Sequence, residues 1–262
     1  MKKKLQAHFD TKDAVLARIV SLSAAYDLPG TPLGSVFEAF ARSIANQQIS
    51  GAVARTILGR LTALFGGRFP TPAELAATPV AQLRAVGFSG SKVAALHDLA
   101  AHYVDGRLPP DAELAALDDE AVIERCIAVR GIGRWTVQMV LMFQLGRHDV
   151  MPIDDFGVRN GFRLAYGLKA MPRPKALLKY AERWKPYRSA GAWYMWRAVD
   201  LHQQDKLPKR EGRAPRIECE APREKPVAAR GKTAAKKKAT PRRKARTPVG
   251  KRAATKRPAR KR

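Results

Sequence analysis

Hydrophobic residues recur at helical spacing along the chain from its first residues to about residue 203. Between residues 36 and 44 they fall on one face of a helix, and Ser35 followed by Glu38 predicts a capping box at its start. Similar patterns predict helices at residues 51–65, 92–104, 118–128, 135–145 and 156–166. Pro72 and Pro79 each predict a shorter helix that has proline at its first position.

The first 33 residues are modestly helical and lack the alternation that a β-sheet subdomain would need. A break is expected at residues 28–33, where two prolines and a glycine interrupt the helical pattern. We therefore predict an all-α protein without an N-terminal β-sheet subdomain.

Two glycines interrupt the helical pattern between the segments 118–128 and 135–145. Asp118 is a plausible N-cap for the first segment, and the second is apolar on nearly every face, which predicts a buried central helix. Gly131 and Gly133 permit a hairpin too tight for side chains, with bare amides that can approach an anion at the start of the second helix. Such a helix-hairpin-helix can hold a DNA phosphate without reading sequence, although the pattern also fits an ordinary helical turn.

Positive charge is concentrated in the last part of the chain. The formal charge of the whole chain is +26, and residues 206–262 contribute 23 Lys and Arg against 4 Glu, which is 23 − 4 = +19. This segment has no hydrophobic period and is predicted to be a disordered tail that neutralises DNA phosphates. A generic solubility tail is the alternative.

Cys126 and Cys219 are the only two cysteines, so neither a disulfide framework nor a cysteine-based metal cluster is expected. An iron–sulfur cluster held by four cysteines is therefore excluded. Neither a secretory leader nor an apolar run of membrane-spanning length is apparent in the sequence. We expect a cytoplasmic, nucleoid-associated protein that has no membrane partner.

A pair of acids opens the predicted helix at 156–166. Asp154 and Asp155 follow Pro152, and an acid at a helix start is more often a cap than a catalytic group. Aromatic residues are concentrated in the segment 179–200, where they would usually belong to the core.

Four segments, in this order, resemble the helix-hairpin-helix (HhH-GPD) base-excision glycosylases, and within them the 3-methyladenine DNA glycosylase II (AlkA) type: FEAFARSIANQQIS, VRGIGRWT, PIDDFGVRNGF and YAERWKPYRSAGAWYMW. The resemblance covers about residues 34–203. It implies two packed helical subdomains with DNA and an extruded base in the cleft between them. We accordingly expect an N-terminal helical segment at 1–33, a glycosylase domain at 34–205 and the basic tail at 206–262.

The resemblance also implies the residues that carry the reaction. Asp155 matches the catalytic carboxylate, and Trp135, Met139 and Trp196 match positions of the base pocket. Relatives that also nick the strand have a lysine at the position of Trp135, so no lyase activity is expected. Methionine at position 139, where a tyrosine is common, leaves the breadth of the lesion range open.

The expected DNA contacts lie on two loops. Gly131, Gly133 and Arg134 would bind the DNA backbone, and Gln48 matches the side chain that fills the gap left by a flipped nucleotide. Main-chain carbonyls of the hairpin, expected at Val129 and Ile132, would hold a monovalent cation, Na⁺ or K⁺. No further cofactor is expected.

These features predict a monofunctional, monomeric enzyme that excises alkylated bases such as 3-methyladenine and 7-methylguanine from double-stranded DNA. One alternative is a glycosylase of the same scaffold for another lesion, such as a mismatched adenine or uracil. The other is a non-enzymatic architectural protein that only binds DNA.

Overall fold

The computed structural model describes residues 1–26, 34–208 and 214–221. The predicted break at 28–33 and most of the basic tail lie outside these residues. The described part consists of α-helices and one short 3-10 helix, joined by turns and loops, and it contains no β-strand longer than an isolated bridge. None of its helices is long and apolar enough to cross a membrane. These observations confirm the all-α prediction.

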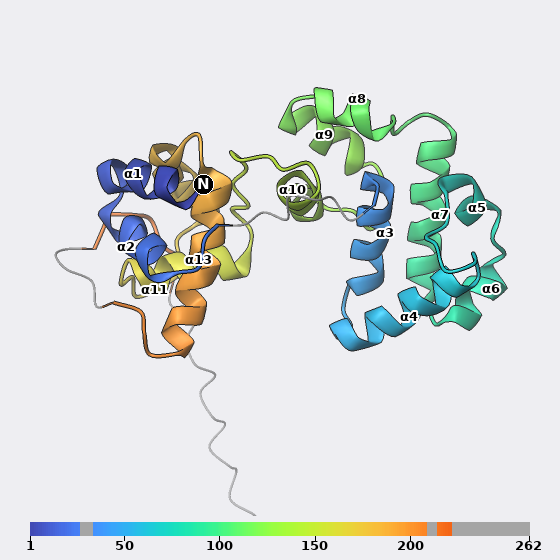
Figure 1. Cartoon of the computed structure of the whole chain (residues 1–262), viewed down its shortest axis with the longest axis horizontal. Helices are drawn as coiled ribbons and strands as arrows, with labels where there is room; N and C mark the ends of the chain where they lie inside the picture. The colour runs from blue at the N-terminus through green and yellow to red at the C-terminus, as the bar shows by residue number, and fades with distance from the viewer. Residues whose placement is uncertain (27–33, 209–213, 222–262) are drawn as a thin grey trace, which may run out of the picture. The chain divides into compact units, whose positions relative to one another are not determined.

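The helices fall into two groups that are each held together by their own contacts (Figure 1). One group joins the N-terminal helices to the C-terminal ones: α1 (Lys2–Lys12), α2 (Ala14–Leu22), α11 (Phe156–Ala165), α12 (Pro174–Ala181), η1 (Glu182–Trp184) and α13 (Arg188–Gln203). The middle of the chain forms the other group: α3 (Val36–Asn46), α4 (Gly51–Ala63), α5 (Pro72–Ala77), α6 (Val80–Val86), α7 (Gly90–Val104), α8 (Asp111–Ala116), α9 (Asp119–Cys126) and α10 (Arg134–Phe143). Within the described residues, α1 and α2 thus pack with η1 and α13 rather than forming a separate unit.

Side-chain caps fix most of the predicted helix starts. Ser35, Asp118 and Asp155 each accept a backbone N–H from the first turn of the helix that follows. The full capping box predicted at Ser35 is absent, because the Glu38 carboxylate pairs with Arg42 instead. A complete capping box occurs at the start of α5, between Thr71 and Glu74.

Several helix boundaries differ from the prediction by one or two residues. Pro79 is the N-cap of α6 rather than its first residue. The helix predicted from residue 92 begins at Gly90, because the Ser89 hydroxyl accepts the N–H of Lys92 at 3.3 Å.

Helices α11 and α13 pack closely enough to require a glycine at their crossing. A Cβ atom added to Gly161 would lie 1.9 Å from the carbonyl oxygen of Met195 on α13. This close approach fixes α11, which carries Asp155 at its start, against the helix that carries Trp196.

Part of the predicted tail belongs to the compact unit, which extends from Met1 to Pro222. Residues 214–221, here called the strap, run beside the loop between α11 and α12. The N–H of Arg173 donates to the carbonyl of Glu218 at 2.8 Å, and the N–H of Glu220 donates to that of Met171 at 2.8 Å. The prediction of a structureless tail from residue 206 is therefore wrong for the strap, because its backbone finds hydrogen-bonding partners that composition does not reveal.

Candidate active site

The Asp155 carboxylate lies at the start of α11 and is held on both oxygens. Oδ1 accepts the N–H of Val158 at 2.7 Å and the indole N–H of Trp196 at 2.8 Å. Oδ2 accepts the indole N–H of Trp135 at 2.8 Å. The side chain is buried, with 8% of the residue exposed, so α10, α11 and α13 together position one carboxylate among aromatic rings. A helix N-terminus favours negative charge at this position.

Of the three residues predicted for a base pocket, two contact Asp155 and the third packs against the core. Trp135 and Trp196 both meet Asp155, as described above, and Trp135 is 46% exposed, so its ring remains accessible. Met139 follows Trp135 by one turn of α10 and is partly buried against the core. Phe143, one further turn along, stacks on Trp196 with ring centroids 5.9 Å apart and an interplanar angle of 20°.

Gly157 makes room for the contact between Asp155 and Trp196. A Cβ atom at this position would lie 2.7 Å from Cδ1 and 2.9 Å from Nε1 of the Trp196 indole, and 3.2 Å from Oδ1 of Asp155. Its backbone is ordinary helix, so the glycine is required for space rather than for conformation. Any larger residue must displace the indole or the carboxylate.

The glycine hairpin between α9 and α10 presents main-chain N–H groups to solvent. Gly131 has φ = 78°, which favours glycine, and Gly133 is an N-cap without a side-chain acceptor for the first turn of α10. Both glycines are exposed, and within the described residues their N–H groups donate to no acceptor. An anion such as a phosphate can therefore be bound there.

The carbonyl groups predicted to hold a cation are of a suitable kind. The carbonyl of Val129 accepts the N–H of Ile132 at 3.1 Å, and that of Ile132 has no donor among the described residues. Neutral main-chain oxygens of this kind are the groups that replace the water shell of a monovalent cation in proteins. These two carbonyl oxygens are thus chemically suitable ligands for the predicted Na⁺ or K⁺ ion.

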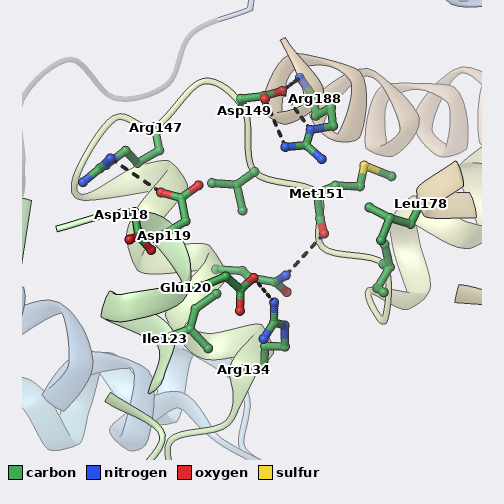
Figure 2. Close-up of a pocket in the computed structure, with 13 residues that line it drawn as sticks. Asp118, Asp119, Glu120, Ile123, Arg134, Arg147, Asp149, Met151, Leu178 and Arg188 are labelled. Carbon is green, nitrogen blue, oxygen red and sulfur yellow. Dashed lines mark hydrogen bonds and ion pairs between the residues drawn. The ribbon is translucent and has the colours of Figure 1, made fainter. Parts of the chain in front are cut away.

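Arg134 points into a cavity of about 530 Å³ rather than standing free beside the hairpin. Figure 2 shows that this cavity contains three pairs of opposite charge: Arg134 with Glu120, Arg147 with Asp119, and Arg188 with Asp149. Burial is the main cause that raises the pKa of the Asp119 carboxyl. None of the three predicted base-pocket residues lines this cavity. A phosphate contact by Arg134 would therefore have to compete with Glu120.

The loop between α3 and α4 carries two glutamines with different surroundings. Gln48 is exposed and has φ = 58°, an unusual conformation for a residue with a side chain. The Gln47 amide donates to the carbonyl of Gly131 at 2.9 Å and thereby ties this loop to the hairpin. Both glutamines line a cavity of about 280 Å³ together with Arg130, Gly131, Ser89, Ser91, Lys92 and Ala95. Burial lowers the pKa of Lys92 in this cavity.

Three residues of the site were not singled out by the sequence analysis: Gln47, Phe143 and Gly157. Phe143 continues the four-residue spacing of Trp135 and Met139 along α10, which is a usable signal. Gly157 lies inside a predicted helix, where glycine is unfavourable and so indicates a packing requirement. Gln47 has no such signal, because its contact depends on two distant loops meeting.

The fold and this arrangement define a helical protein with a helix-hairpin-helix motif beside a buried carboxylate. Residues 41–186, more than half of the chain, match the HhH-GPD superfamily of base excision DNA repair proteins. The chain therefore belongs to the HhH-GPD superfamily.

Within this superfamily, the chain is similar to relatives that are named DNA-3-methyladenine glycosylases. DNA-3-methyladenine glycosylase 1 of Schizosaccharomyces pombe is 36% identical over 206 residues, which cover 78% of this chain and 90% of the relative. DNA-3-methyladenine glycosylase 2 of Escherichia coli is 30% identical over 201 residues, covering 73% of this chain and 67% of the relative.

A solved structure of the same class of enzyme resembles this chain in fold. The 3-methyladenine DNA glycosylase of S. pombe in complex with abasic DNA matches with a TM-score of 0.67 and 35% identity. The match covers 76% of this chain and 97% of that one.

Proposed function

We propose that this protein is a monofunctional DNA glycosylase that releases alkylated bases, such as 3-methyladenine and 7-methylguanine, by hydrolysis of the N-glycosidic bond. The observation that carries the proposal is the Asp155 carboxylate, which is buried between the indoles of Trp135 and Trp196 at the start of α11. Family membership and the named relatives support the same substrate class.

In the proposed reaction, Asp155 stabilises the positive charge that develops on the sugar as the bond to the base breaks. A fixed carboxylate in a site with little water is worth more for this purpose than one in bulk solvent. The same group can orient or deprotonate the attacking water. Both oxygens are already hydrogen-bonded, and the one donor on Oδ2 comes from the half-exposed Trp135. We infer that this indole shifts when a flipped nucleotide enters.

The aromatic residues would recognise the extruded base. N3- and N7-alkylpurines carry positive charge, and an electron-rich indole face attracts such a cation by about 0.5–2 kcal/mol. Trp135 and Met139 would form one wall, and Trp196, supported by Phe143, the other. Because position 135 has no amine, no Schiff base can form there and the product would be an abasic site.

Main-chain groups of the hairpin would hold the DNA. The N–H groups of Gly131 and Gly133 would bind a phosphate, aided by the N-terminus of α10, while Gln48 would enter the gap left by the flipped nucleotide. A monovalent cation on the carbonyls of Val129 and Ile132 would supply positive charge next to the same phosphate.

Single-turnover release of 3-methyladenine and 7-methylguanine from methylated duplex DNA tests the proposal. Replacing Asp155→Asn keeps a good helix cap but removes the negative charge, so release should slow by about 100-fold or more. Asp154→Asn is the matched control, because this neighbouring acid is exposed and should be dispensable. Gels run without alkali should show no strand nicks.

Two outcomes would contradict the proposal. Release of mismatched adenine or uracil instead of alkylpurines would indicate another lesion on the same scaffold. Tight DNA binding without base release from any lesion, unchanged by Asp155→Asn, would favour the architectural alternative.

A further inference from the structure

A basic groove lies beside α12, on residues that take no part in the proposed active site. The groove has a volume of about 500 Å³ and is lined by Lys175, Ala176, Lys179, Tyr180, Arg183, Arg216, Ile217 and Glu218. One wall is α12 with η1, and the other is the strap. The groove therefore exists only because the strap packs beside α12 and η1.

The four cations of the groove are unneutralised. Lys175, Lys179, Arg183 and Arg216 are all exposed, and within the described ranges none of them is paired with a carboxylate. The one acid in the lining, Glu218, is paired with Arg173 at 2.7 Å. The groove thus concentrates positive charge that no side chain of the described residues compensates.

The cations are also regularly placed. Lys175 and Lys179 lie four residues apart on α12, which separates their Cα atoms by about 6 Å along the helix axis, and Arg183 follows four residues later in η1. The Arg183 guanidinium lies 3.8 Å from the centre of the Tyr180 ring, and its Nε donates to the Tyr180 carbonyl at 3.1 Å. This side chain is therefore held in place before any ligand binds.

The strap continues directly into the most basic part of the sequence. Residues 223–262 contain 18 Lys and Arg against a single Glu. The covalent connection makes the groove the start of a longer positively charged segment. A partner that engages both must carry negative charge over a considerable length.

We propose that this groove binds the phosphate backbone of duplex DNA as a second contact, separate from the glycine hairpin. Duplex DNA carries about one negative charge per 1.7 Å of its axis. A row of cations matches this dense, regular charge better than it matches the scattered acids of a protein surface. The contact is independent of base sequence, because phosphates carry no sequence information. It goes beyond the proposed function and rests on it only in that the protein meets DNA.

Lysine footprinting on the full chain tests this assignment without any mutation. Acylation of each lysine is measured by mass spectrometry in the absence and in the presence of undamaged duplex DNA. Lys175 and Lys179 should be protected by the duplex, whereas Lys3 and Lys12, exposed on α1, should react equally in both cases. Equal protection of all four lysines, or of none, would overturn the proposal.

A second arm separates DNA from other polyanions. Poly-glutamate at the same charge concentration should protect Lys175 and Lys179 much less than the duplex does. Equal protection would assign the groove to acidic polypeptides and overturn the assignment to DNA.

Matched charge reversals measure the contribution to binding. Lys175→Glu with Lys179→Glu should make the slope of log affinity against log salt concentration less negative by about 2, because each lost phosphate contact removes about 0.9. Lys3→Glu with Lys12→Glu makes the same change in net charge and should leave the slope close to that of the wild type. Equal slopes in the two variants would contradict a specific groove contact.

Base release distinguishes the failure of this proposal from failure of the proposed function. At a saturating concentration of duplex DNA, the variant with Lys175→Glu and Lys179→Glu should release alkylated bases at the wild-type rate. Release without lysine protection would refute only the groove, and lysine protection without release would refute only the glycosylase.

Discussion

Gly157 shows how strongly one missing side chain shapes the candidate site. The space beside its Cα is filled by the Trp196 indole, which reaches Oδ1 of Asp155 through its N–H. The Trp196 indole thus orients the carboxylate, and Gly157 contributes only the space that this contact needs. The same position in a free helix would be better served by alanine, so the glycine lowers helix propensity by about 1 kcal/mol in favour of this geometry.

We predict that Gly157→Ala lowers the single-turnover rate of base release by roughly 10- to 100-fold, because an ångström-scale displacement of a reacting group has effects of this order. The thermal unfolding midpoint should change little, since the alanine favours the helix and the displaced indole is at the edge of the core. Base release quenched at successive times measures the single-turnover rate, and calorimetry measures the unfolding midpoint.

Gly59→Ala is the control for this prediction. Gly59 lies in α4 with no atom within 4 Å of an added Cβ, so that variant should keep its full rate. Wild-type activity in Gly157→Ala would show that the contact between Trp196 and Asp155 is dispensable.

At the scale of the elements, one buried acid joins the N-terminal helices to α11. The Asp13 carboxylate caps α2 through the N–H of Leu16, and its other oxygen accepts the Tyr166 hydroxyl at 2.6 Å and the Trp184 indole at 2.8 Å. Tyr166 immediately follows α11, the helix that begins at Asp155. Asp13 therefore anchors the far end of the helix that carries Asp155, the proposed catalytic carboxylate.

Asp13→Ala should reduce the free energy of unfolding by about 3 kcal/mol or more, because it leaves two buried donors without an acceptor. Urea unfolding followed by tryptophan fluorescence measures this loss. The comparison is Asp10→Ala, which removes an exposed acid of α1 whose partner is Gln6, and should cost little. Equal effects of the two substitutions would be inconsistent with the network described above.

At the scale of the whole molecule, the boundary of the compact unit lies at Pro222 rather than at residue 205. The strap adds two main-chain hydrogen bonds to the loop before α12, and Glu220 pairs with Arg159 of α11. The strongly basic remainder of the chain is attached at the end of this strap. We expect its charge to act in DNA binding, and we expect the strap to stabilise the folded unit through its hydrogen bonds.

Truncation at two positions separates these roles. Removing residues 223–262 should weaken binding to undamaged DNA at low salt and reduce its salt dependence, while leaving single-turnover base release unchanged. Removing residues 206–262 should in addition lower the free energy of unfolding by about 1–3 kcal/mol, through loss of the strap hydrogen bonds. Binding isotherms at several salt concentrations and urea titrations give the two readouts.

A collapse of single-turnover chemistry on removal of residues 223–262 would refute a purely electrostatic role of this segment. Identical stability of the two truncations would show that the strap is dispensable for folding.

Much of the helical architecture could be predicted from local sequence. The starts of α3, α9 and α11 depend on capping side chains next to apolar runs, and these signals act over a few residues. The glycine hairpin is equally local, because Gly131 adopts a conformation that other residues avoid. Errors occurred where a side chain had a competing partner, as with Glu38, which binds Arg42 rather than closing the capping box.

The sequence by itself determined the helices, the hairpin, the family and the identity of the residues that we assign to the reaction, since all of these reside in local patterns and contiguous motifs. Only the tertiary structure decided which oxygen of Asp155 meets which indole, why position 157 is glycine, and that Arg134 pairs with Glu120. It also placed the strap beside α12 and so created the basic groove. These features depend on side chains and backbone from distant segments meeting at distances of a few ångströms, which no local pattern encodes.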